Sequence, residues 1–594
     1  MAGSSRRTLG GDALWTSFIA LFNAAAGRSF ADAGEIGWGL MPGWAADKSR
    51  SPAFPLRAFW QRLPRPLRAL MVKLVQGLGR VPAGGGRVVV FLLAYAAVWT
   101  ISATVWNLGR PIHFDMAEAF ALSREPAIGY FKFSPLINWV TAAWFAVMPP
   151  AGWSFYLLAF LNAALGMWFV WLAAAFVVDR RRRIAAVALL GLMPVFTFGV
   201  ALFNHNTFQL SLWPLVAVTF LASIERPHAA WSVLFGLASG LAILGKYYAG
   251  LIVLACVLAT LLHPKRRSYL RSPRPYLAAA VCALVLAPNL YWLVEHDFIS
   301  IRLHVTEERT VDRPLTVIVH ALSFVGAYVA LSSTALVAFW LCLRPWNAAM
   351  TRSVVADWHG ARAVVACIAS APVALPLVLL APAGIPLHSP WNDPAFFFVP
   401  LTALSAPRLF VTYRAVAVMV GAVATTAIAA LALSPVLMIG NFIIAKPENV
   451  EPFIPLARFA TETWHDRIGG PLEFVSGSDH AAWSVSFYSP DHPNVFPGYS
   501  EFLPQAEIER RWKERGVLGI CHAAEAPCTE MFEAALPRAK RVEITLPVTF
   551  LGFSHAAESY VLYLQAAAGR AAFYLKAYDH LAAAFAGRVV ETLC

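Results

Sequence analysis

Residues 231–262 read WSVLFGLASGLAILGKYYAGLIVLACVLATLL, an almost unbroken apolar run with a single lysine near its middle. A helix that crosses a bilayer needs about 20 apolar residues. The run therefore fits either one long helix or two shorter spans that reverse at Gly245-Lys246-Tyr247-Tyr248. The loops on either side of it decide between the two.

Composition places the whole chain in the membrane class. Of the 594 residues, 58% are hydrophobic and 14% are charged, whereas a soluble domain has about 25% charged residues. The net charge of +13 fits the accumulation of Lys and Arg in cytoplasmic loops, beside membrane lipids. It does not predict a nucleic-acid partner.

We count about eleven apolar runs that could span a bilayer. They lie at about residues 88–108, 154–178, 185–203, 208–224, 230–245, 249–263, 276–294, 315–342, 363–382, 395–411 and 415–440.

Basic residues follow the even-numbered runs, as in Arg180-Arg181-Arg182-Arg183 after the second and Lys265-Arg266-Arg267 after the sixth. The positive-inside rule makes these loops cytoplasmic, which predicts a cytoplasmic N-terminus and a C-terminus outside. One helix over 231–262 would put Lys265 outside, so we expect the run to reverse. The same argument predicts a break at Phe203-Asn204-His205-Asn206-Thr207.

Three regions follow from this reading. Residues 1–87 are a cytoplasmic segment expected to be poorly ordered, in which 13–26 is either an amphipathic surface helix or part of an upstream extension. Residues 88–445 form the transmembrane catalytic domain, whose outer loop 109–153 carries the candidate site. Residues 446–594 are expected to form a periplasmic α/β domain that shapes access to the site, with strands at 472–477 and 517–521 and a helix at 505–515.

Two cysteines of this last region, Cys521 and Cys528, lie seven residues apart. An oxidising compartment favours a disulfide between them. Two buried thiols are the alternative.

The outer loop begins with two carboxylates, Asp115 and Glu118. Their spacing puts them on one face of a helix, just beyond the predicted membrane surface. An Asp in the first turn also stabilises a helix through its dipole. A solvated helix start and an acid–base site therefore both fit the pattern.

Five segments, in order, resemble those of the C superfamily of membrane glycosyltransferases, above all family 39. They are Asp115-Met116-Ala117-Glu118, Gly129-Tyr130-Phe131-Lys132-Phe133-Ser134-Pro135, Phe203-Asn204-His205-Asn206, Lys246-Tyr247-Tyr248 and Arg271-Ser272-Pro273-Arg274-Pro275-Tyr276. They are most similar to bacterial members of the rhizobial lipopolysaccharide galacturonosyltransferase type. The resemblance covers residues 88–310 well. It implies that superfamily's all-α polytopic membrane fold of about eleven helices with a small C-terminal α/β extracytoplasmic domain, in a bacterial inner membrane.

Four positions depart from the family. Phe133 and Ser134 stand where His and Pro are usual, Asn206 stands about where the lipid A aminoarabinose transferase has an Asp, and Glu118 lies near an Arg of that enzyme. The sugar and the acceptor are therefore not carried over from it.

The resemblance implies transfer of a hexose, pentose or uronic acid from a polyprenyl-phosphate donor to a glycolipid or protein acceptor, with inversion. Such a transfer needs a base for the acceptor hydroxyl and positive charge at the departing phosphate. Asp115 is the predicted base, with Glu118 next in line, and Lys246 is the predicted phosphate partner unless it only snorkels to water. The other predicted substrate-binding residues are Tyr130, Lys132, Asn204, Asn206, Tyr247, Arg302 and Arg309, of which the two arginines also fit a solvated loop.

No cofactor is expected, because Lys or Arg can neutralise a phosphate monoester. A divalent metal held by His113, His205 or His304 with the two acids is not favoured, since no ligand spacing supports it. A transporter or flippase of lipid-linked sugars is the competing function, and a catalytically silent scaffold is the third. Charges at the outer face and the lack of a clear internal repeat favour the enzyme.

Overall fold

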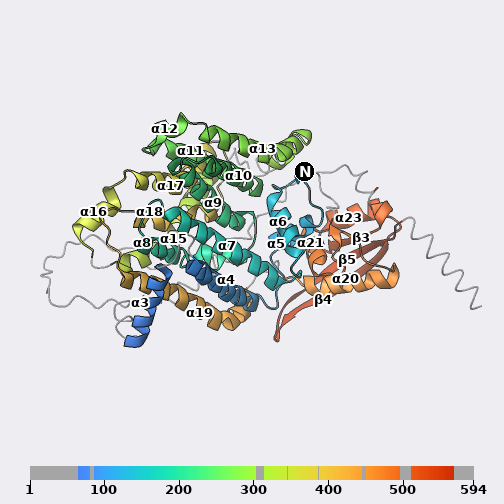
Figure 1. The fold of residues 1–594 in the computed structure, drawn as a ribbon. Helices are drawn as coiled ribbons and strands as arrows, with labels where there is room; N and C mark the ends of the chain where they lie inside the picture. Colours follow the sequence, from blue (N-terminus) through green and yellow to red (C-terminus); the bar gives the residue numbers. More distant parts are fainter. Residues whose placement is uncertain are drawn as a thin grey trace, which may run out of the picture.

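The computed structural model describes residues 64–79, 86–302, 314–343, 346–385, 387–444, 450–495, 510 and 512–567. A helical bundle forms most of the molecule, and an α/β region formed by the C-terminal part of the chain lies against one side of it (Figure 1). Helix α3 (Arg65–Gly79) occupies part of the segment that the sequence analysis expected to be poorly ordered. Its Met71 and Val75 pack against the bundle core, so that expectation is wrong over these residues.

Among the described residues, seven helices are long and apolar enough to cross a membrane. They are α4 (Gly86–Trp106), α7 (Gly152–Ala174), α9 (His205–Glu225), α13 (Arg274–Glu295), α15 (Pro314–Cys342), α17 (Ala361–Leu379) and α19 (Tyr413–Ile444). The chain is thus a multi-pass membrane protein, and each of these helices matches a predicted apolar run.

The other four predicted runs form shorter pieces. Two are the helices α10 (Ala229–Gly245) and α11 (Gly250–Leu262). The run at 185–203 is not one straight helix: α8 (Arg180–Leu190) bends by 77° into the short turns η2 (Pro194–Phe196) and η3 (Gly199–Ala201). Of the run at 395–411, only residues 395–404 are helical, in η5 (Ser389–Phe398) and α18 (Val399–Leu404). Both corrected runs contain prolines, which lack the N–H that a continuous α-helix needs.

The chain reverses after α10, as the loop charges predicted. Lys246 has an extended backbone (φ −167°, ψ 128°) and is followed by the turn η4 (Tyr247–Ala249) and then by α11. At the far end of α11, His263 Nε2 and Lys265 Nζ lie 3.0 and 2.5 Å from the carboxylate of Glu225, the last residue of α9. Helix α11 therefore runs back antiparallel to α10.

The basic loops gather at one end of the bundle, which we call the basic end. Arg182 donates hydrogen bonds to the carbonyls of Leu404 and Ala406 (3.2 and 3.1 Å), and the Arg226 guanidinium lies 5.2 Å from the Phe176 ring. The starts of α9 and α11, with Asn204 and Lys246, lie at the opposite end, which we call the site end.

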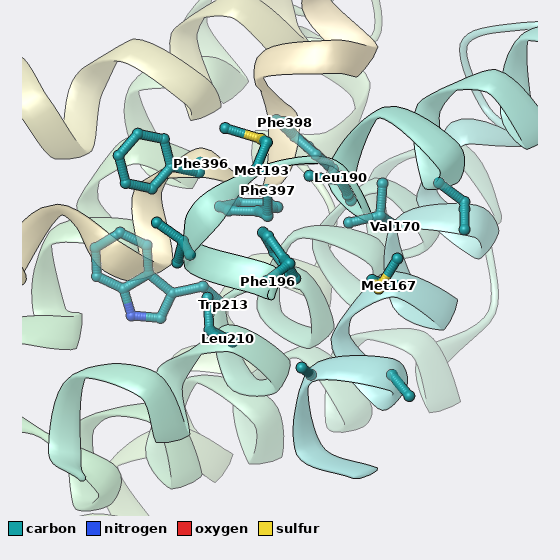
Figure 2. Packing of buried hydrophobic residues seen from close by; sticks show 14 of the residues in the cluster. Met167, Val170, Leu190, Met193, Phe196, Leu210, Trp213, Phe396, Phe397 and Phe398 are labelled. Atoms are coloured by element: carbon teal, nitrogen blue, oxygen red, sulfur yellow. The ribbon is translucent and has the colours of Figure 1, made fainter. Parts of the chain in front are cut away.

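Glycines let neighbouring helices of the bundle pack closely against one another. A Cβ added at Gly236 of α10 would lie 2.3 Å from the Ala278 carbonyl of α13, and one at Gly166 of α7 would lie 2.0 Å from the Leu210 carbonyl of α9. Small residues of this kind let helix backbones approach in a membrane. Figure 2 shows the neighbouring core, in which Trp213 of α9 and Met167 of α7 pack with the phenylalanines 396–398 of η5.

In the described part of the C-terminal region, a five-stranded sheet has the order β2-β1-β3-β5-β4. The strands are β1 (Phe474–Gly477), β2 (Asn494–Val495), β3 (Val517–His522), β4 (Lys540–Phe550) and β5 (Phe553–Gln565). The first three strands pair in parallel, and β5 pairs antiparallel with β3 and β4. Helices α20 (Phe453–Arg467) and α21 (Asp479–Tyr488) cover one face and α23 (Ala526–Ala535) the other.

The predicted strands at 472–477 and 517–521 are confirmed as β1 and β3. Of the helix predicted at 505–515, residue 510 and residues 512–515 are described and helical. The predicted disulfide Cys521–Cys528 is also confirmed and joins β3 to α23. The long β4–β5 hairpin was not predicted.

Candidate active site

The outer loop folds into two short helices, α5 (Phe114–Ser123) and α6 (Leu136–Phe145). His113 caps α5, and its Nδ1 accepts a hydrogen bond from the Asp115 backbone N–H at 3.2 Å. Burial lowers the pKa of His113, so its ring is neutral at neutral pH. Asp115 and Glu118 then lie one turn apart at the start of the helix, as their spacing predicted.

The Asp115 carboxylate is held by the predicted site residue Asn204. The Asn204 amide donates to Asp115 Oδ2 at 3.0 Å, and the Asp115 side chain keeps 27% of its surface exposed. Asn204 is itself fixed as the N-cap of α9, where its Oδ1 accepts from the backbone N–H groups of Asn206 and Thr207. The carboxylate is therefore oriented on one side and open on another.

The buried Glu118 forms an ion pair with the partly exposed Lys132, which precedes α6. Lys132 Nζ lies 3.0 Å from Glu118 Oε1, and the two side chains are 43% and 7% exposed. Burial raises the pKa of Glu118 to about 7, although the Lys132 charge opposes this shift. Burial, the largest single influence, lowers the pKa of Lys132, but the charge and hydrogen bond of Glu118 and the charges of Asp115 and Asp479 together outweigh it, and the net shift is upward. At neutral pH the pair thus combines a protonated lysine with a carboxyl group poised to titrate.

The start of α9 contacts Asp115, the segment that contains Lys132, and Lys246. His205 stacks on Phe133 with their ring centroids 4.2 Å apart, and the side-chain oxygen Oδ1 of Asn206 accepts a hydrogen bond from Lys246 Nζ at 2.5 Å. Residues 204–206 therefore connect Asp115, the Lys132 segment and Lys246 in one site. Phe133, a departure from the family pattern, serves here as a stacking partner.

Lys246 lies among groups that the sequence analysis did not all anticipate. Its ammonium is 5.5 Å from the Tyr248 ring and 5.3 Å from the Trp391 ring, and its charge acts on the carboxyl group of Asp393. Asp393 was missed, although an acid beside an apolar run is costly in a membrane and usually has a cationic partner.

Of the four remaining predicted residues, the two tyrosines brace the surrounding loops. The Tyr130 hydroxyl accepts from the Ala127 backbone N–H at 3.0 Å, and the Tyr247 hydroxyl donates to Asn289 at 3.1 Å. Arg302 is exposed, two residues after Ser300. Arg309 lies outside the described residues. Substrate binding by these four residues stays a prediction.

Helix α21 of the C-terminal region reaches the same site, which the sequence analysis did not predict. His480 stacks on Phe114 at 4.4 Å with an interplanar angle of 14°, and Lys132 Nζ lies 5.4 Å from the Trp483 ring. Burial lowers the pKa of His480 to about 4, and the positive charge of Lys132 adds to this shift. No sequence motif marked α21, because only the folded sheet directs it toward α5.

Within the described ranges, no three His, Cys, Asp or Glu side chains gather in a group that could hold a metal ion. Independence from a metal stays a prediction.

These features define a polytopic membrane protein with paired acids and cations at one end of a helical bundle, under an α/β cap. The fold is that of ArnT from Cupriavidus metallidurans, solved in the apo state and bound to undecaprenyl phosphate. The two structures match with TM-scores of 0.51 and 0.50 at 16% identity, over 82% and 80% of this chain and 99% and 97% of theirs.

Residues 132–292 match the family model described as dolichyl-phosphate-mannose-protein mannosyltransferase. Two curated proteins of Rhizobium johnstonii, the lipopolysaccharide core galacturonosyltransferase RgtB and the lipid A galacturonosyltransferase RgtD, are each 25% identical over 32% of this chain. The matches span only 39% and 40% of those relatives' length. Together with the fold, these matches make the chain similar to members of the C superfamily of membrane glycosyltransferases, near family 39.

Proposed function

We propose that this protein transfers a sugar from a polyprenyl-phosphate donor to an acceptor hydroxyl at the extracytoplasmic face of a bacterial inner membrane. The observation that carries the proposal is that two acids and two lysines lie together at the site end. Asn204 and Asn206, at the start of α9, bind Asp115 and Lys246, and Lys132 binds Glu118. The names of the relatives support a cell-envelope glycolipid, such as lipopolysaccharide core or lipid A, as the acceptor. A protein acceptor also fits the matched family description.

In the proposed reaction, Asp115 takes the proton of the acceptor hydroxyl as its oxygen attacks the anomeric carbon. The new bond joins this oxygen to the sugar, and the bond between the anomeric carbon and the phosphate oxygen breaks. The released electron pair stays on polyprenyl phosphate, where Lys246 and Lys132 stabilise the growing negative charge. Direct displacement from the opposite side inverts the anomeric centre.

Glu118 has a separate part in this scheme. It holds Lys132 beside Asp115 through the 3.0 Å contact. An acid that is buried and titrates near neutral pH is typical of active sites. No cofactor is proposed, because the two lysines supply the positive charge that the leaving group needs.

The orientation rests on the loop charges. The basic end would face the cytoplasm, and the site end would face the periplasm with the C-terminal region. A reporter fused after Cys594 that is active only when exported tests this directly. Activity of a cytoplasm-restricted reporter at the same position would overturn the orientation.

Purified protein reconstituted in vesicles with a polyprenyl-phosphate sugar separates the enzyme from the competing transporter. A glycosyltransferase releases polyprenyl phosphate when an acceptor is present. A transporter or flippase moves the donor between leaflets and leaves the bond between sugar and phosphate intact, and that result would refute the proposal. Asp115→Asn serves as the control, because the exchange removes the proposed base and preserves the size of the side chain.

A further inference from the structure

We propose that helix α21 of the C-terminal region is part of the active site, where Trp483 and Asp479 position the Lys132 ammonium against Glu118. The C-terminal region would then be required for the chemistry itself. The kinetic part of the argument rests on the proposed function, whereas the contacts and the chemical test below do not.

The far end of α21 is anchored to the outer loop. The Tyr488 hydroxyl accepts a hydrogen bond from the Ile112 backbone N–H at 2.7 Å. Phe487 packs edge-to-face on Phe120 of α5, with ring centroids 5.1 Å apart. Helices α21 and α5 lie side by side (Figure 1), and the stacking of His480 on Phe114 at 4.4 Å places the first turn of α21 at the start of α5, near Asp115 and Glu118.

Lys132 depends on this helix for part of its surroundings. Its ammonium is 3.0 Å from Glu118, 4.8 Å from the Phe133 ring and 5.4 Å from the Trp483 ring. The side chain is 43% exposed, so contact with Glu118 alone leaves it room to adopt other rotamers. The aromatic face of Trp483, which is itself buried, limits that freedom and attracts the cation.

Asp479 acts on the same pair through its charge. It favours the protonated form of Lys132 and disfavours the ionised form of Glu118. The charged and titratable groups around the pair are Asp115 of α5, Asp479 and His480 of α21, and His113 before α5. Asp479 is therefore a negative charge that the C-terminal region places beside Lys132 and Glu118 at the site end.

The test compares Trp483→Leu and Trp483→Phe with a matched control, Trp512→Leu, all in the full chain. Trp512 is buried on the other face of the sheet, where it stacks on Phe532 at 5.0 Å. Its loss therefore disturbs the same domain from the face opposite α21. Competitive acylation of lysines across a pH range, read by mass spectrometry of the peptide that contains Lys132, reports how shielded and how basic this amine is without needing turnover.

We expect Trp483→Leu to increase the labelling of Lys132 and to lower kcat/KM by about 2- to 30-fold, the range of a cation–π contact. Trp483→Phe should restore most of both. Asp479→Asn should lower the pKa of Lys132 in the labelling curve and move the acid limb of the pH–rate profile to lower pH. Trp512→Leu, corrected for its folded fraction, should leave Lys132 labelling unchanged.

The proposal is overturned if Lys132 labelling in Trp483→Leu matches that of Trp512→Leu, or if Trp483→Phe fails to restore it. If the wild-type protein transfers no sugar, the proposed function fails and the labelling comparison still decides the role of α21.

Discussion

Replacing Asp115 with Asn removes the proposed base and changes little else. The Asn204 amide lies 3.0 Å from Asp115 Oδ2, and an Asn at position 115 would offer its own carbonyl oxygen to the same donor. Its NH2 group would then face the open side, where it cannot accept a proton. Because the side chain is 27% exposed, the neutral amide stays solvated and stability should change by less than about 1 kcal/mol.

The expected loss of rate follows from the role assigned to Asp115. A positioned general base contributes about 10²–10⁴ in rate, which corresponds to about 3–5 kcal/mol of transition-state stabilisation. Donor binding should stay near the wild-type level, since both lysines remain. Asn204→Ser keeps an N-cap residue on α9 but shortens the donor, so it should cost only about 10- to 100-fold through the lost hydrogen bond to a charged group.

The assay measures kcat and the donor KM for the wild type and both variants, with a thermal unfolding curve for each. The reasoning predicts a fall in kcat that is larger for Asp115→Asn than for Asn204→Ser, at similar donor KM. If Asp115→Asn retains turnover within about threefold of wild type, far below the loss of a base, the base lies elsewhere. Glu118 is then the next residue to test.

Three further predictions concern Lys246, Glu118 and the disulfide. Lys246→Ala should raise the donor KM as well as lower kcat, because the phosphate is present in both ground and transition states; unchanged donor binding would mean that Lys246 only snorkels. Because burial raises the pKa of Glu118 to about 7, kcat/KM should fall as the pH drops through this value and the ionised form that holds Lys132 is lost. Glu118→Gln should flatten this limb, and a limb that persists in the variant belongs to another group. Cys521→Ser should lower the free energy of unfolding by about 2–3 kcal/mol, the chain-entropy value for so short a loop; denaturation of both forms without reductant checks it.

The membrane architecture could be predicted because its physical signals are local. Apolar length marks the spans, and the charges at Arg180–Arg183 and Lys265–Arg267 fix on which end each loop lies. The reversal at Lys246 and the break at residues 203–207, just where α9 begins, followed from the same two rules and are confirmed. The disulfide followed from compartment and spacing alone.

The predictions that failed depend on backbone geometry or on distant contacts. Pro194 breaks an apolar run that reads as one span by hydropathy, since hydropathy does not register a missing N–H. Asp393 and Trp483 lie about 280 and 350 residues from Asp115 and Lys132 in sequence, and only the packing of η5 and α21 brings them to the site. A site assembled from such distant elements could be recognised in part, from the motifs near α5, α9 and α10.

The central claim is that this chain breaks the bond between a sugar and polyprenyl phosphate. The most direct test incubates the purified full chain with a polyprenyl-phosphate sugar and a lipopolysaccharide-type acceptor, and follows extracted lipids by mass spectrometry. The account predicts equal amounts of free polyprenyl phosphate and glycosylated acceptor for the wild type, and formation of both products about 10²–10⁴ times more slowly for Asp115→Asn. Intact donor after prolonged incubation with folded wild-type protein, over a panel of sugars and acceptors, would contradict it.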